Sequence, residues 1–327
     1  MAHQLILLKN GKKQNITQLI GNLAWSSNID ALGVELGFDF AYNDSRYFEN
    51  LDLVEVGDQV ALMSEGNFLG HFIVVTASLS GKFGKSFTCF DLSWYLNKNK
   101  TIIQFKKVSA SQAIGKLLDK FSVKHRIAAM SPLITKIYNG EVVSDIIKDV
   151  LEQVKQETKI TYRMEMDKDT LVISRMSDLT INPMVRISSN TAAVPIVATI
   201  SNPSRELSIE EMRNKVIVAA DGETTKVYAQ SSDSDSIARF GQLTEVIGVY
   251  DKNAAQARNI AANTLAELNR IGETISCEML GHDDIRAGRI LNVGEPVTGL
   301  SGRYLIKSAN HTEHNGIHKV SVELEAV

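Results

Sequence analysis

The segments GHFIVVTASLSGKFGKSFTCFDL (70–92) and GRYLIKSANHTEHNGIHKVSVEL (302–324) carry the same pattern. They align without a gap, and these identical residues coincide: Gly70 with Gly302, Ala77 with Ala309, Gly84 with Gly316, and Leu92 with Leu324. Just upstream, VGDQVAL (56–62) matches AGRILNV (287–293), with Gly57 over Gly288. Self-similarity at a fixed distance is the sign of a repeated structural unit. We interpret the chain as an internal duplication, so that one molecule can mimic a dimer.

Each copy alternates apolar and polar residues around a glycine-containing turn, which predicts a β-hairpin. Gly84 and Gly316 hold the same place near the turn, so we expect both to have a similar backbone conformation at positive φ. Successive side chains alternate across a strand. The alignment therefore predicts a shared facing for two sets of residues: Phe72, Val74, Thr88 and Phe90, and Tyr304, Ile306, Val320 and Val322.

Composition excludes several classes of protein. The 327 residues are 44% hydrophobic and 22% charged, with a net charge of −3, so no basic excess favours nucleic acid or an anionic membrane. No run approaches the ~18 apolar residues of a membrane span, and the first residues do not resemble a signal peptide. We therefore expect a soluble protein made in the cytoplasm. Cys89 and Cys277 lie in alternating runs and are expected to be buried, reduced thiols.

The pattern divides the chain into three parts. Residues 1–98 read as β-strands throughout. Residues 99–200 read as an α+β insert followed by an extended connection, and residues 201–327 return to β-strands with one long helix at 251–270. Asp251 is the expected N-cap of that helix. The fold class is therefore mainly β with a small α+β domain.

Within the insert, a helix capped by Ser109 and a second helix over 141–157 each present one apolar face. A hairpin is expected from 160–166 and 170–175. Residues 176–206 lack periodicity and are expected to be an extended connection with one or two strands. A further hairpin is expected at 214–219 and 226–229, with its turn at Asp221-Gly222.

Three histidines, His311, His314 and His318, are the best metal candidates in the sequence. They surround a predicted hairpin turn and have no cysteine or acidic partner at ligand spacing, so a solvated hairpin is the preferred interpretation over zinc. Asp233 and Asp235 in SSDSDS lack the glycine and distal glutamate of a calcium loop, which favours a flexible polar loop.

Other polar clusters have simple structural explanations. Asp283 and Asp284 beside His282 are more simply turn residues at a strand entrance than an acid–base pair. Trp94 and Tyr95 near Lys98 could stack on bases, but without a basic surplus a core cluster at a strand end is preferred. The sequence has no nucleophile elbow, phosphate loop, HExxH or dinucleotide fingerprint. We therefore assign no catalytic, cofactor-binding or metal residue, and no cofactor.

A series of short motifs resembles one family in order and spacing over essentially the whole chain. These motifs are Ile16-Thr17-x-Leu19-Ile20 with Trp25-Ser26, Gly57-Asp58-x-Val60, Phe90-Asp91 with Tyr95-Leu96, Phe105-Lys106-x-Val108-Ser109-Ala110, Glu211-Met212-x-Asn214-Lys215-Val216, Gly241-x-Leu243, Thr298-Gly299-Leu300-x-Gly302-x-Tyr304-x-Ile306, His311 and Asn315-Gly316-x-His318. The chain resembles the PBSX-prophage-type (XkdQ/YqbQ-like) baseplate hub proteins, which are related to the VgrG and late control D hub fold.

The resemblance implies two tube-like β-barrel domains, at 1–98 and 201–327, with the insert between them. It implies a homotrimer in the baseplate of a contractile phage tail or an R-type bacteriocin, assembled in the bacterial cytoplasm. The expected neighbours are the tail tube initiator above, the central spike below and baseplate wedge components around it. Three chains with two similar barrels each would match a sixfold tube to a threefold spike, because a ring repeats one joint surface.

Two alternatives come from other classes of protein. A cell-wall-degrading tail enzyme would need a cleft with a perturbed carboxyl group, and the sequence offers no such pair. A receptor- or glycan-binding β-module would favour exposed aromatic platforms, but aromatic residues are only 6% of the chain. The hub interpretation involves no nucleic-acid recognition and no membrane insertion by this chain.

Overall fold

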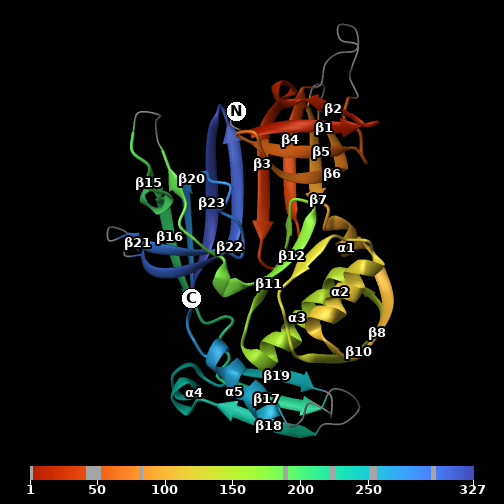
Figure 1. The fold of residues 1–327 in the computed structure, drawn as a ribbon. Helices are drawn as coiled ribbons and strands as arrows, with labels where there is room; N and C mark the ends of the chain where they lie inside the picture. Colours follow the sequence, from red (N-terminus) through yellow and green to blue (C-terminus); the bar gives the residue numbers. More distant parts are fainter. Residues whose placement is uncertain are drawn as a thin grey trace.

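The computed structural model describes residues 3–41, 53–80, 84–186, 191–220, 226–249, 256–295 and 300–327. It is mainly β, as expected (Figure 1). The strands of the first half are β1 His3–Lys9, β2 Lys12–Asn15, β3 Ile20–Asn28, β4 Val34–Ala41, β5 Gln59–Ser64, β6 Asn67–Ser80 and β7 Gly84–Asp91, with the short 3-10 helix η1 Thr17–Leu19. They pair in the order β2-β1-β5-β6-β7-β4-β3.

The second half repeats this order. Its strands are β16 Ser201–Ser208, β20 Gly272–Leu280, β21 Ile290–Glu295, β22 Leu300–His314 and β23 Ile317–Ala326. They pair as β21-β22-β23-β20-β16, which matches β5-β6-β7-β4-β3 of the first half. Strand β3 also pairs with β22, so both halves belong to one continuous sheet (Figure 1). The pairings of the described strands do not close either half, and barrel closure stays a prediction.

The backbone confirms the duplication in detail. Gly57 and Gly288 both have positive φ, at 93° and 85°. Each donates its N–H to the carbonyl of an aligned residue, Val74 or Ile306, at 2.8 Å. The two halves also share an irregularity in strand pairing, because β6 and β22 both have a register shift directly after that aligned residue. Two equivalent rows of paired residues cross the halves: Val74–Cys89–Leu36–Trp25 and Ile306–Leu324–Ile275–Arg205.

The gapless alignment is wrong for the return strand. Val74 faces Cys89, whereas the aligned Ile306 faces Leu324, so the second hairpin is longer by an odd number of residues. An odd shift reverses the facing of every side chain. In the first strand of each hairpin the prediction holds, because Phe72 and Val74 are buried like Tyr304 and Ile306. In the return strand it fails, because Thr88 and Phe90 are only half-buried while the aligned Val320 and Val322 are buried. The buried side chains of the first return strand are those of Phe87 and Cys89.

The expected equivalence of Gly84 and Gly316 is therefore also wrong. Asn315 and Gly316 form a two-residue turn at φ 52° and 77°, the conformation that glycine and asparagine tolerate best. Gly84 is not in this left-handed region, and a Cβ there would lie 2.6 Å from the Ser80 carbonyl oxygen. Gly84 permits close backbone approach, whereas Gly316 permits an unusual φ. The rest of the first turn, residues 81–83, lies outside the described residues.

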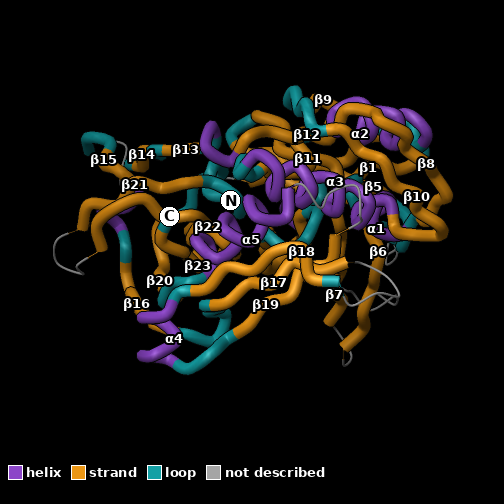
Figure 2. Tube along the Cα trace, turned by 90° about the horizontal axis from the view of Figure 1, so that it is seen from below, coloured by secondary structure: helices purple, strands orange, loops and turns teal. Residues whose placement is uncertain are grey.

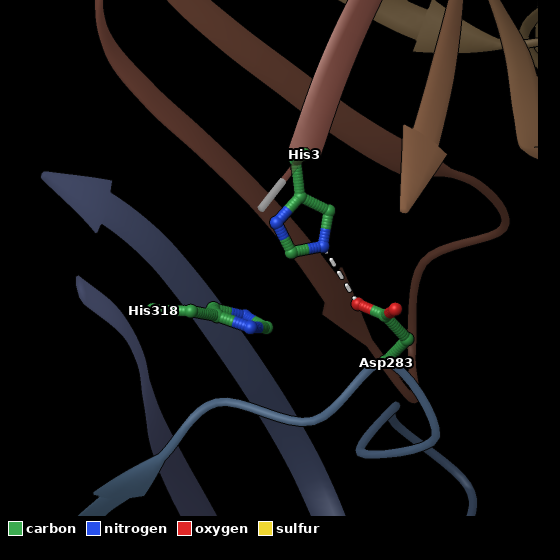
Figure 3. A group of neighbouring side chains, drawn as sticks. All are labelled: His3, Asp283 and His318. Carbon is green, nitrogen blue, oxygen red and sulfur yellow. Dashed lines mark hydrogen bonds and ion pairs between the residues drawn. The ribbon is translucent and has the colours of Figure 1, made fainter. Parts of the chain in front are cut away.

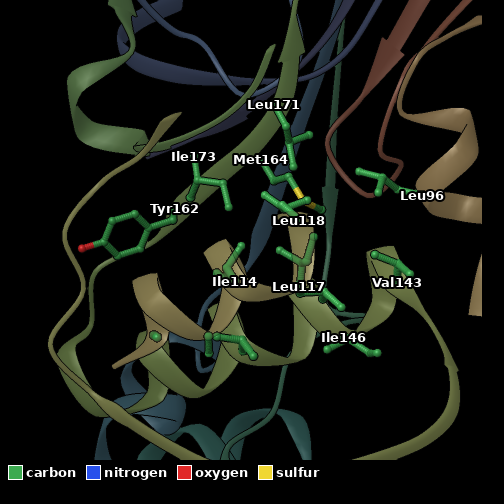
Figure 4. Packing of buried hydrophobic residues seen from close by; sticks show 14 of the residues in the cluster. Leu96, Ile114, Leu117, Leu118, Val143, Ile146, Tyr162, Met164, Leu171 and Ile173 are labelled. Atoms are coloured by element: carbon green, nitrogen blue, oxygen red, sulfur yellow. The ribbon is translucent and has the colours of Figure 1, made fainter. Parts of the chain in front are cut away.

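The insert confirms the predicted helices and hairpin. Its elements are α1 Trp94–Lys98, β8 Lys100–Ser109, α2 Ala110–Lys120, β9 His125–Ile127, β10 Leu133–Val142, α3 Val143–Thr158, β11 Tyr162–Asp167 and β12 Thr170–Arg175. The Ser109 hydroxyl caps α2 by accepting the Gln112 N–H. The apolar faces of α2 and α3 meet over β11 and β12 in one core (Figure 4). None of the described helices is long and apolar enough to span a membrane.

Residues 176–206 form short elements, as expected for a connection: η2 Met176–Asp178, β13 Thr180–Ile181, β14 Met184–Val185, β15 Val194–Pro195, η3 Ile196–Thr199 and then β16. A separate small unit follows between β16 and β20. It consists of β17 Lys215–Ala220, β18 Val227–Ser232, α4 Ser234–Phe240, β19 Thr244–Val249 and α5 Ala257–Leu268. The predicted hairpin of β17 and β18 is confirmed, and its turn at Asp221-Gly222 lies outside the described residues.

This unit has its own core, in which α5 covers the three-stranded sheet (Figure 2). The predicted helix 251–270 is thus observed over Ala257–Leu268, while Asp251 lies outside the described residues. The expectation of a flexible loop at Asp233 is wrong. Its carboxylate accepts the N–H groups of Asp235 and Ser236 and caps α4. The domain limits at residues 98 and 200 stay predictions.

Candidate functional site at the joint of the two halves

The contact between β3 and β22 is the only point where the repeated units pair directly among the described strands. Trp25 of β3 lies opposite His311 of β22, and their rings stack at 4.8 Å with an interplanar angle of 5°. Four further polar residues surround this pair, and we call the whole group the joint cluster: His3, Trp25, Asp283, His311, Glu313 and His318. The group lies where both halves and the first strand of the chain meet.

His3 lies between two carboxylates. Its Nδ1 is 2.6 Å from Glu313 Oε2. Its Nε2 is 2.8 Å from Asp283 Oδ1 (Figure 3). Both His3 and Glu313 are fully buried, whereas Asp283 is partly exposed. The backbone N–H of His3 also donates to Glu313, at 3.2 Å. These contacts tie β1 to β22 and to the loop between β20 and β21.

His311 and His318 form a second hydrogen-bonded chain. His311 Nε2 donates to the Ile285 carbonyl at 2.7 Å, so in the neutral ring its Nδ1 accepts from His318 Nε2 at 2.9 Å. The remaining ring nitrogen of His318, Nδ1, then carries a lone pair. The His318 ring lies directly on Gly281, where a Cβ would approach it to about 2.1 Å. Glycine is therefore required under this histidine.

The cluster contains histidines of two kinds. Burial lowers the pKa of His3, but hydrogen bonds and charge from Asp283 and Glu313 outweigh it, so that its pKa lies above the usual value. Burial raises the pKa of Asp283, yet the hydrogen bonds of His3 and Ser64 bring it down to about 2. Burial and a neighbouring histidine lower the pKa of His311 to about 3 and that of His318 to about 4. The two carboxyl groups thus favour the protonated form of His3, whereas burial favours the neutral forms of His311 and His318.

The structure changes several expectations from the sequence. The preferred solvated hairpin is wrong for His311, which is 1% exposed, because the β3 edge covers this strand. His314 is exposed, lies outside the joint cluster and hydrogen-bonds Asn22. Asp283, interpreted as a simple turn residue, joins His3, whereas Asp284 stays exposed. His3 itself gave no signal in the sequence, since its partners are some three hundred positions away.

The aromatic group near Lys98 also differs from its expected place. Trp94 and Tyr95 belong to the short helix α1 and not to a strand end. Their rings meet edge to face at 5.2 Å, and Tyr95 remains 41% exposed. Leu96 supplies the core residue of this helix.

A second polar contact fixes the insert to both halves. Arg163 of β11 donates to the carbonyls of Ile29 at 2.6 Å and Asn28 at 3.0 Å. Glu165 of the same strand accepts two hydrogen bonds from Arg289, at 2.7 and 3.0 Å. The Arg163 side chain lies against Gly288, whose missing Cβ makes room for it. β11 therefore connects the end of β3 with the start of β21.

The fold of this chain, with one five-stranded unit that occurs twice and an α+β insert, matches the folds of solved tail proteins. The solved tail protein of Neisseria meningitidis MC58 matches with a TM-score of 0.72 at 15% identity, over 99% of this chain and 97% of that one. Escherichia coli c3393, described as a type VI secretion component with structural similarity to the T4 tail proteins gp27 and gp5, matches with a TM-score of 0.55 at 9% identity, over 94% and 73% of the chains.

The sequence matches the YQBQ-like family over residues 23–325, and the chain belongs to that family. Two Bacillus subtilis (strain 168) relatives support this. YqbQ is 24% identical over 276 residues, 83% of this chain and 82% of YqbQ. The phage-like element PBSX protein XkdQ is 22% identical over 287 residues, 86% of this chain and 84% of XkdQ. The expected family is therefore confirmed.

Proposed function

We propose that this protein is a structural hub of a contractile tail baseplate, a homotrimer that adapts a sixfold tail tube to a threefold central spike. The observation that carries the proposal is the repeat itself: two units with the same strand order, the same glycine turn and the same register shift. Its relationship to a PBSX protein and its fold likeness to tail and type VI secretion proteins support a place in such a particle.

The two halves differ in which strand edges are covered. One edge of β22 pairs with β21 and then, at residues 308–313, with β3. The same edge of β6 pairs with β5 up to Ile73, and no described strand pairs with residues 76–80 there. Likewise β3 pairs on both sides, but its counterpart β16 pairs only with β20 among the described strands. Open edges of this kind recruit further strands.

The internal joint supplies a template for these open edges. β6 corresponds to β22 and β16 corresponds to β3, so β16 of one chain would pair with β6 of the next as β3 pairs with β22. The equivalent rows across the halves set the register. In the proposed pairing, Arg205 of β16 takes the place of Trp25 and lies opposite Leu79 of β6, which takes the place of His311. In the same way, Leu207 takes the place of Ser27 and lies opposite Ala77, which takes the place of Ala309. Leu79 and Leu207 are 67% and 59% exposed in the single chain, which this joint would reduce.

Three chains joined in this way would form a ring of six similar units. Three joints would be internal β3–β22 contacts, and three would be contacts between chains. Such a ring repeats one geometry at every joint while keeping true threefold symmetry. The proposed neighbours are the tail tube initiator on the near-sixfold face, the spike on the threefold face and wedge components outside. We assign no catalytic residue to the chain.

A disulfide tests the register directly. Ala77→Cys combined with Leu207→Cys places two cysteines directly opposite each other, within bridging distance for a paired position. Under oxidation we expect a covalent trimer on a non-reducing gel. Ala77→Cys with Pro203→Cys is the matched control, since four residues along a strand is about 13 Å and too far to bridge. Equal cross-linking of both pairs, or only monomeric species from both, would contradict the proposed joint.

Mass in solution at several concentrations, alone and with tube and spike proteins, tests the trimer independently. A chain that stays monomeric in a particle-derived complex containing both neighbours would overturn the hub assignment. Muralytic activity of the purified protein would instead favour the cell-wall enzyme. Binding to whole cells without other tail parts would favour the receptor or glycan module.

A further inference from the structure

The joint cluster contains a group of side chains with the composition of a metal site. His3, Asp283 and His318 each offer one ligand atom, and these atoms lie within 4.8 Å of one another (Figure 3). They come from β1, from the loop before β21 and from β23, so no sequence motif links them. We propose that these three residues bind one divalent first-row cation, with Zn²⁺ as the best-suited ion, and that the cation fastens the two halves together.

The donor types fit this ion. Two imidazoles and one carboxylate are a common ligand set for zinc, which leaves a fourth position for water. Ligand atoms around a tetrahedral zinc lie about 3.3 Å apart, as follows from metal–ligand distances near 2.0 Å. The His3–Asp283 separation of 2.8 Å must open slightly, and the wider spacing within the group must contract. Asp283 and His318 are both partly exposed, so an ion can reach the group from solvent.

Every proposed ligand also hydrogen-bonds a supporting residue. His3 directs Nδ1 at the buried Glu313 carboxylate, the arrangement that orients a metal-binding histidine and presents Nε2 to the metal. His318 is held by His311, which is itself fixed by the Ile285 carbonyl. The Ser64 hydroxyl bonds Asp283. A chance meeting of surface groups would not bring such a shell of supporting contacts.

Charge and space favour a cation here as well. Two carboxyl groups, those of Asp283 and Glu313, lie on either side of the His3 ring in a largely buried place. Gly281 has no side chain, and this lets the His318 ring lie close to the chain beside the group. The inference does not depend on the hub function.

Zinc titration of tag-free protein by calorimetry tests the proposal. We expect one Zn²⁺ per chain. Asp283→Asn and His318→Gln should each weaken binding by about tenfold or more, and Glu313→Gln by about 10- to 100-fold through His3. His314→Gln is the matched control, because this exposed histidine lies on the same hairpin outside the group, and it should bind like the wild type. Binding that persists in both Asp283→Asn and His318→Gln would overturn the site.

A second measurement needs no variant of the ligands. Trp25 lies 4.6 Å from His3 and 5.0 Å from His318, whereas Trp94 is the only other tryptophan. In a Trp94→Phe background, Cu²⁺, which nitrogen ligands bind most tightly in the first-row series, should quench the fluorescence, and excess Zn²⁺ should restore it. No saturable quenching at one ion per chain, in protein with an unchanged circular dichroism spectrum, would refute the proposal.

Discussion

At the scale of single residues, the duplication allows the same substitution to be compared at two equivalent positions. Gly57 and Gly288 are equivalent and both have positive φ, but they differ in their surroundings. A Cβ at Gly57 would meet nothing within 4 Å, whereas one at Gly288 would lie 2.8 Å from the Arg163 side chain.

We therefore expect unequal costs from the same substitution. Gly57→Ala should destabilise by about 1–2 kcal/mol from backbone strain alone. Gly288→Ala should cost the same backbone strain and about 1–3 kcal/mol of stability in addition, because the new Cβ also displaces the Arg163 side chain. Thermal melting of both variants checks this. Equal shifts would mean that Arg163 moves away freely.

The two cysteines should be inert in the folded protein. Burial raises the pKa of Cys89 to about 12 and that of Cys277 to about 11, so almost no thiolate is present at pH 8. A chromogenic disulfide reagent should label neither thiol rapidly in native protein, and both in guanidinium chloride. Rapid labelling of one thiol under native conditions would show that its strand opens locally.

Sequence reasoning at this scale succeeded for the buried cysteines and failed for the joint cluster. Cys89 is predictable because its neighbours alternate in polarity. The pairing of His3 with Asp283 and Glu313 is not, because it depends on β3 lying beside β22. Nothing local to residue 3 reports that contact, and a single histidine in an apolar strand has many possible partners.

At the scale of elements, local signals performed well. The helices over Ala110–Lys120 and Val143–Thr158 follow from apolar periodicity and, for the first, from the Ser109 cap. The prediction for the return strand of the second hairpin was wrong, because the low sequence identity between the copies hid the extra length of this hairpin. The return strand was therefore aligned with its side chains on the wrong face. Strand phase is set by the partner strand across the sheet, which the sequence alone does not reveal.

The docking of β11 should depend on pH. Burial raises the pKa of Glu165, but the hydrogen bonds of Arg289 and nearby arginine charges outweigh it and lower the pKa overall. Ionised Glu165 therefore stabilises the fold above about pH 4.5, its value in the unfolded chain, and this contribution is lost as the pH falls through the folded-state pKa.

Glu165→Gln should then cost about 1–3 kcal/mol at pH 7, and its difference in melting temperature from wild type should shrink below pH 4.5. Glu267→Gln, which removes an exposed ion pair with Lys155, is the control and should have little effect at either pH. If the loss of stability in Glu165→Gln did not change with pH, packing rather than the charge of Glu165 would hold β11 in place.

At the scale of the whole molecule, the proposed ring predicts a dependence on the sign of one charge. In that ring Leu79 faces Arg205 of the next chain. Leu79→Lys places like charges opposite each other on two strand edges and should abolish the trimer. Leu79→Glu places opposite charges there and should preserve it.

Sedimentation of both variants, with melting curves to confirm that each chain folds, provides the measurement. Equal assembly of the lysine and glutamate variants would rule out this register, whether or not a trimer exists. Since Leu79 is exposed in the single chain, neither change should alter the melting temperature of the monomer appreciably.

The small unit between β16 and β20 has a consequence for how such a chain can evolve. In the first half the corresponding strands, β3 and β4, are linked only by residues 29–33, whereas the second half carries a folded unit over the interval 209–271. In a ring of identical single-repeat chains, any insertion would appear at all six positions and compete for room with its own copies. Fusion of two repeats into one chain allows one half to keep a short connection while the other half carries an insertion, so that the insertion occurs at every second position of the ring. Duplication thereby doubles the space open to each new appendage.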